Sequence, residues 1–149
     1  MLIKKIRLLF KLNRRTIFLF GETYIFLGWA RILMFWPFAK IAPTLGVKTE
    51  ETPITHITTD ITKLKHISHA IDIISRYTFW DSKCLVKAIA GMKMLERRRI
   101  ECTLYLGTAK DENGKLIAHA WLRSGPIYVT GADVMNRFIV VEKFANKAS

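Results

Sequence analysis

The sequence predicts an α+β fold in which helices come first and an antiparallel sheet follows. Apolar residues recur at helical spacing over residues 61–74 and fill most positions over residues 83–98. After residue 102 the pattern changes to short alternating runs separated by turn residues, which is typical of strands. At 149 residues the chain can bury one real core, so one domain with an N-terminal extension is expected.

Basic and aromatic residues dominate residues 1–60, which we interpret as a helical segment and a linker ahead of a core over residues 61–149. Residues 16–36 are rich in large apolar side chains. They predict a pair of amphipathic or mostly buried helices, broken near Gly28 or at Pro37. The Pro, Gly and Thr content of residues 43–60 predicts the linker.

Positive charge is concentrated at the same end of the chain. The formal net charge is +12, and residues 1–48 contain nine Lys or Arg but a single acid, Glu22. Such a balance indicates an anionic partner, which is nucleic acid, a membrane surface or an acidic peptide. Glu22 and Arg31 would be costly inside a bilayer, so a membrane span is disfavoured. Contact of the basic, aromatic helices with a membrane surface stays open.

Two helices are predicted in the next part of the chain. The first begins at Ile61, with Asp60 as its N-cap. The second covers roughly residues 83–98, with Ser82 or Asp81 as its cap. Its apolar side chains run most of the way round, as expected of a helix buried in the middle of a domain.

Four strands are predicted after these helices, and tight turns separate the first three. The turn sequences are Asp-Glu-Asn-Gly at 111–114 and Ser-Gly-Pro at 124–126. The strands are expected over residues 103–108, 116–123, 127–130 and 138–142.

The two cysteines are too few for a disulfide framework, and no secretory cleavage pattern follows the N-terminus. A reduced, cytoplasmic environment is therefore expected, which leaves a thiol free for chemistry. Cys84 lies in the first turn of the second predicted helix. Unpaired N–H groups and the positive end of the helix dipole favour a thiolate there and can receive an oxyanion. Cys102, just before a strand, is interpreted as structural.

A histidine and an aspartate follow Cys84 on the predicted sheet. His119 lies between two alanines in a strand, and Trp121 shares its face. In one of two registers His119 lies across from Gly131, and Asp133 is its diagonal neighbour on the same face. The other register puts Asp133 on the opposite face, and both stay open. Cys84, His119 and Asp133 are then candidates for nucleophile, base and orienting carboxylate.

Each candidate also has an ordinary interpretation. A lone cysteine is usually a small hydrophobe, a strand histidine a satisfied semi-buried group, and an aspartate after Gly-Ala a turn residue. The combination of a thiol at a helix start and an imidazole on the following sheet favours catalysis. His56, His66 and His69 lack further ligands at metal spacing, so neither a metal nor a cofactor is predicted.

Several segments carry a family resemblance. They are Cys-Leu-Val-Lys-Ala-Ile-Ala at 84–90, Leu-Glu-Arg-Arg-Arg-Ile at 95–100, Leu-Tyr-Leu-Gly at 104–107 and Ala-His-Ala-Trp at 118–121. Together with residues 29–38, these segments resemble the leader peptidase of lasso-peptide biosynthesis, which has a transglutaminase-like, papain-related core. The sequence departs from the family at Arg99-Ile100-Glu101, where the family often has a glycine.

The resemblance implies a cysteine endopeptidase that removes the leader from a ribosomally made precursor peptide, with Cys84, His119 and Asp133 as the matching triad. It also implies a separate leader-recognition protein, because no strand-rich segment is predicted before residue 60. The product would pass to an ATP-dependent lasso cyclase, and no nucleic-acid partner is expected. Two alternatives stay open. One is an acyl-transfer enzyme with the same triad, and the other is a non-catalytic basic module that binds a membrane or nucleic acid.

Overall fold

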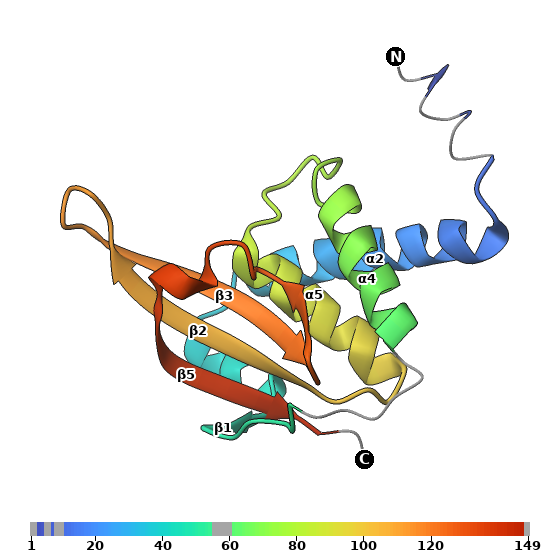
Figure 1. The fold of residues 1–149 in the computed structure, drawn as a ribbon. Helices are drawn as coiled ribbons and strands as arrows, with labels where there is room; N and C mark the ends of the chain where they lie inside the picture. Colours follow the sequence, from blue (N-terminus) through green and yellow to red (C-terminus); the bar gives the residue numbers. More distant parts are fainter. Residues whose placement is uncertain (1–2, 5–6, 8–10, 55–60, 148–149) are drawn as a thin grey trace.

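A computed structural model describes residues 3–4, 7, 11–54 and 61–147 of the chain, and its element order confirms the α+β prediction (Figure 1). Helices precede the sheet, apart from one short strand. The elements are α2 (Arg14–Leu33), α3 (Phe38–Ile41), η1 (Ala42–Thr44), β1 (Val47–Lys48), α4 (Ile61–Ile74), α5 (Cys84–Arg97), β2 (Cys102–Lys110), β3 (Leu116–Ser124), β4 (Ile127–Thr130), η2 (Met135–Arg137) and β5 (Ile139–Asn146).

The five strands form one antiparallel sheet in the order β1-β5-β2-β3-β4. The β2–β3 hairpin turns at Asp111, whose Oδ1 accepts from the backbone N–H groups of Asn113 and Lys115 at 2.9 and 2.8 Å. Strand β4 pairs with β3 only over residues 122–124. The preceding part of β3, residues 116–121, therefore forms an edge of the sheet on that side.

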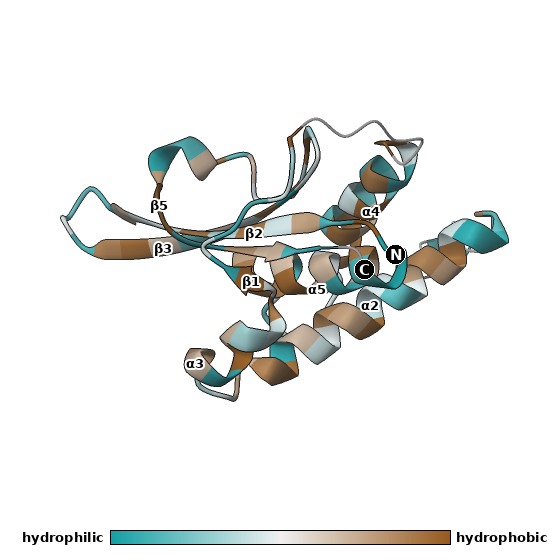
Figure 2. Ribbon diagram, turned by 90° about the horizontal axis from the view of Figure 1, so that it is seen from below, coloured by the Kyte–Doolittle hydropathy of each residue, from teal (hydrophilic) through white to brown (hydrophobic). Residues whose placement is uncertain are grey.

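Helix α5 is the centre of the molecule, as its apolar sequence predicts. Figure 2 shows the sheet edge-on, with α5 and then α2 on one side and the β4–β5 connection on the other. A Cβ on Gly91 of α5 would lie 2.9 Å from Cδ2 of Leu122 and 3.1 Å from Cδ1 of Ile71. This glycine therefore lets α5 lie close to both the sheet and α4.

Helix α2 is continuous through Gly28, so the predicted break at that glycine is wrong. Asn13 caps the helix by accepting from the backbone N–H of Thr16 at 2.8 Å. A Cβ at Gly28 would be in van der Waals contact with the ring of Trp80, at 3.4 Å. The helix ends before Pro37, which confirms the alternative boundary. The pair of amphipathic or mostly buried helices expected over residues 16–36 is one helix, of which only one face is covered.

An ion pair joins α2 to the end of α5. Arg98 donates two hydrogen bonds of 2.7 Å to the two carboxylate oxygens of Glu22. Arg97 adds a third contact to Glu22, at 3.1 Å. Leu27 and Ala30 of α2 are fully buried in the hydrophobic cluster that also contains the α5 residues. Residues on both sides of position 60 thus share one core.

The start of α5 differs in detail from the prediction. Lys83 is the N-cap residue, and no side chain caps the helix. Ser82 lies one residue before the cap position, and its hydroxyl contacts the hydroxyl of Thr78 at 2.9 Å. Asp60, the cap predicted for α4, lies outside the described residues.

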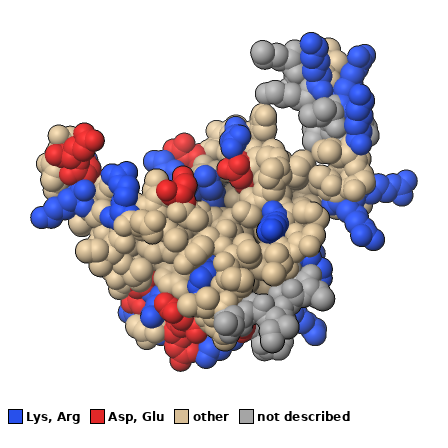
Figure 3. All heavy atoms as spheres, in the orientation of Figure 1, with Lys and Arg blue, Asp and Glu red and all other residues tan. Residues whose placement is uncertain are grey.

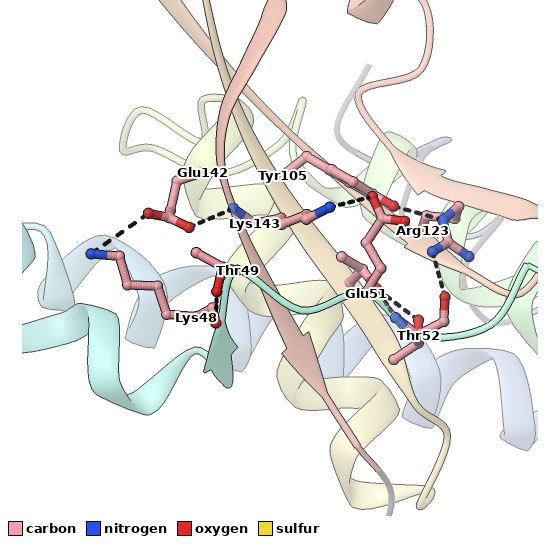
Figure 4. Close-up of polar contacts among 9 residues, drawn as sticks. Lys48, Thr49, Glu51, Thr52, Tyr105, Arg123, Glu142 and Lys143 are labelled. Atoms are coloured by element: carbon pink, nitrogen blue, oxygen red, sulfur yellow. Dashed lines mark hydrogen bonds and ion pairs between the residues drawn. The ribbon is translucent and has the colours of Figure 1, made fainter.

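The predicted linker contains structure that the sequence pattern did not indicate. Strand β1 pairs with the end of β5, and the chain after it is attached to the sheet (Figure 4). The backbone N–H of Thr52 donates to Oγ1 of Thr103 at 2.9 Å. The carbonyl of Thr52 accepts from Arg123 at 2.7 Å. Two residues are too few to show an alternating pattern, which is why β1 was missed.

Candidate functional site

Cys84 is the first residue of α5 and is half-buried, with its neighbours packed on the core. The first helical bond runs from the N–H of Lys87 to the carbonyl of Lys83, at 3.0 Å. The N–H groups of the first turn have no partner within the helix, and they point out of its positive end. The structure therefore places this thiol beside donors that can receive a developing negative charge.

The loop before Cys84 is held in place by Thr78 and Trp80. The Thr78 hydroxyl bonds the carbonyl of Ser75 at 3.1 Å and that of Trp80 at 3.0 Å. The Trp80 ring packs edge-on against Tyr24 of α2, with centroids 5.0 Å apart. These contacts fix where α5 begins, and with it the position of the thiol.

His119 lies on β3, and its ring stacks on two aromatic rings. The centroid separations are 5.8 Å to Trp121 and 5.0 Å to Phe138. The expectation that His119 and Trp121 share a face is confirmed. Nε2 of His119 lies 2.9 Å from the carbonyl oxygen of Gly131. Because a carbonyl only accepts, Nε2 carries the proton, and Nδ1 is the free basic nitrogen of the neutral ring.

Gly131 also belongs to this site, although the sequence prediction assigned it no role. Its φ of +76° is in the left-handed region, which favours glycine. A Cβ here would also lie 2.7 Å from the carbonyl oxygen of Ala120 and 3.1 Å from Nε2 of His119. The only sequence signal for this role was a glycine just after the end of a predicted strand. The bond to its carbonyl depends on tertiary structure.

The sheet separates His119 from Cys84. Leu122 faces α5, because its Cδ2 is close to Gly91. Side chains alternate along a strand, so Trp121 and His119 point to the opposite face, beneath the β4–β5 connection. Cys84 and His119 form no hydrogen bond with each other within the described residues. The thiol and the imidazole are thus on different faces of the sheet in this conformation.

Asp133 is exposed and lies beyond the end of β4. Among the described residues it has no hydrogen bond or ion pair, and the carbonyl of Gly131 occupies the position beside His119. Strand β4 ends at Thr130 after a register shift opposite Leu122 and Arg123. Neither of the two simple registers therefore continues as far as Asp133.

A cavity of about 470 Å³ lies between α4 and β4. It reaches from Lys87, one turn after Cys84, to Gly131, the hydrogen-bond partner of His119. Lys65 and His69 of α4 also line it. A second hollow of about 410 Å³ lies on the other face, lined in part by Trp121 and Phe138. Of these two hollows, the first lies next to residues that neighbour Cys84 and His119.

Cys102 has the environment of a structural cysteine. It is fully buried in the core cluster. Burial raises the pKa of its thiol to about 12, and the carboxylates of Glu96 and Glu101 act in the same direction. The neutral thiol is therefore the species present at physiological pH, and Cys84 is the more accessible cysteine.

Comparison with known proteins identifies one family. The model of the transglutaminase-like superfamily matches residues 27–143, from the middle of α2 to β5. No curated protein and no solved structure matches the chain. The match includes Cys84, His119 and Asp133, and it begins within the N-terminal helix that the sequence suggested as an appendage.

Proposed function

Because the chain belongs to the transglutaminase-like superfamily, a superfamily of cysteine proteases and acyltransferases, we propose that it is a leader peptidase. Its substrate is a ribosomally synthesised lasso-peptide precursor, presented by a separate leader-recognition protein. Both cysteines are free thiols, and we assign the step to the cytoplasm. The position of Cys84 at the start of a 14-residue helix inside the family match is the observation that carries the proposal.

In the proposed reaction the sulfur of Cys84 attacks the carbonyl carbon of the last leader residue, and His119 takes the thiol proton. The N–H groups at the start of α5 receive the oxyanion. His119 then returns the proton to the leaving amine of the core peptide, and the leader remains as a thioester on Cys84. Water attacks this thioester with His119 as base, which releases the leader carboxylate and restores the thiol. Asp133 is assigned the orienting role that the resemblance implies.

This mechanism requires a second position for the His119 ring. In the structure the ring bonds Gly131 on the face away from α5. The part of β3 that contains His119 has no β4 partner, and the backbone of Gly131 lies beside it, so the rotated position requires the His119–Gly131 bond to break. We propose that substrate binding in the neighbouring cavity favours the rotated ring, whose free nitrogen then meets the thiol.

Release of the core peptide supplies the substrate of the ATP-dependent lasso cyclase.

The test is incubation of the chain with precursor and leader-recognition protein, analysed by mass. Cys84→Ala is expected to abolish cleavage, whereas Cys102→Ala, which changes the other cysteine, retains it. Both variants are expected to assemble with the leader complex. Full cleavage by Cys84→Ala would refute the proposal.

Two other functions are separated by the same products. Acyl transfer, the second activity of the superfamily, yields a new amide in place of a free leader carboxylate. The separation of Cys84 from His119 favours a third candidate, a non-catalytic basic module. That candidate predicts no cleavage in any variant and salt-sensitive binding to anionic lipid or nucleic acid.

A further inference from the structure

Helix α2 is apolar on two opposite faces, and the protein covers only one of them. Thr23, Leu27 and Ala30 are fully buried against the rest of the core. About half a turn away on the helix, Phe18 and Ile25 are 76% and 68% exposed. The helix is long and apolar enough to cross a membrane, yet only 17% of its most apolar window is buried.

The uncovered residues form one continuous stripe. They recur at intervals of three or four along α2, as expected of a single helix face. We call them the α2 stripe: Phe18, Gly21, Ile25, Trp29 and Ile32, with exposed Trp36 just beyond the end of the helix. Trp29 and Trp36 are amphipathic rings that favour the boundary between water and hydrocarbon. The stripe is thus a large apolar surface on an element that extends beyond α4 and α5 (Figure 1).

The charges around the stripe are positive. Lys11, Arg14 and Arg15 are exposed at the N-terminal end of α2. Figure 3 shows Lys and Arg side chains over this protruding end and acidic side chains on the main body. Glu22 is the single acid in residues 1–48, and its carboxylate is paired with Arg98 and Arg97 at the end of α5. An apolar stripe with cations alone at its end complements an anionic lipid surface.

We propose that α2 lies in the interface of an anionic membrane, with the α2 stripe in the acyl boundary and the N-terminal cations among the headgroups. A helix that crosses the bilayer does not fit this structure. It would have to leave the contacts of Leu27 and Ala30 and carry Glu22 away from Arg98. Lying on the surface keeps the whole core intact.

The experiment is sedimentation of the purified full chain with vesicles. One set is equimolar phosphatidylcholine and phosphatidylglycerol, and the other is phosphatidylcholine alone. The chain is expected to sediment with the anionic vesicles and to be released as salt screens the charges. Ile25→Ser is expected to weaken binding about tenfold, because it removes a side chain that the acyl boundary would cover.

Matched variants make the outcome decisive. Leu116→Ser removes an apolar residue of nearly equal exposure, 67%, from β3 and is expected to leave vesicle binding unchanged. Wild-type chain that stays in the supernatant would overturn the proposal, as would equal effects of Ile25→Ser and Leu116→Ser. A dimer that Ile25→Ser dissociates, with no vesicle binding, would assign the stripe to a second copy and also overturn it.

Discussion

The ion pair between Glu22 and Arg98 attaches the N-terminal helix to the core, and Glu22→Gln tests how much it stabilises the protein. The two side chains are 14% and 29% exposed, so solvent screens the pair only in part. At an effective dielectric of about 20, unit charges about 4 Å apart attract by about 4 kcal/mol. Desolvation of the carboxylate and the guanidinium offsets roughly half of this attraction. We expect Glu22→Gln to lower the free energy of unfolding by about 2 kcal/mol.

The matched control is the ion pair between Asp72 and Arg76, whose N···O distance of 2.8 Å is almost the same. Both of its side chains are exposed, at 59% and 68%, so Asp72→Asn is expected to cost less than about 0.5 kcal/mol. Urea unfolding followed by circular dichroism measures both variants. Equal losses for Glu22→Gln and Asp72→Asn would refute the argument that burial makes the first pair strong.

Two further predictions concern Cys102 and Gly131. The unfolded chain releases the Cys102 proton above pH 9.0, whereas the folded chain keeps it up to about pH 12. The free energy of unfolding therefore falls over this window, by about 1.4 kcal/mol per pH unit from this group. Cys102→Ala should reduce this fall of the free energy of unfolding with pH, and Cys84→Ala should not. Equal pH dependence in the two variants would contradict the assignment of the fall to Cys102. Gly131→Ala should destabilise by about 1–3 kcal/mol more than Gly114→Ala in the same urea assay. Both glycines have φ +76°, but only Gly131 has atoms within 4 Å of the new methyl group, so equal losses would show that this crowding costs nothing.

Much of the fold follows from the sequence pattern. Helix α5 and the β2–β3 hairpin were predicted because their periodicities extend over many residues and the Asp111 turn is specific. Strand β1 was not predictable, since Val47 and Lys48 pair with β5 only through tertiary structure. The continuity of α2 through Gly28 was not predictable either, because Leu27 and Ala30 on both sides of the glycine are buried by tertiary packing.

The candidate site was predictable only in part. The helix start at Cys84 follows from local pattern, and so does the shared face of His119 and Trp121. The local pattern does not show which face of β3 contacts α5, because Trp121 and Leu122 make both faces apolar. The hydrogen bond from His119 to Gly131 depends on a register shift in β4 that no local pattern indicates.

The central claim is that Cys84 is the nucleophile, and its most direct test is a trapped acyl-enzyme. The chain is mixed with precursor and leader-recognition protein, stopped in acid, and its intact mass and modified peptide are measured. We predict a thioester to the leader on Cys84, present in Cys102→Ala and absent in Cys84→Ala. An adduct on another residue, or leader release that persists in Cys84→Ala, would contradict the claim.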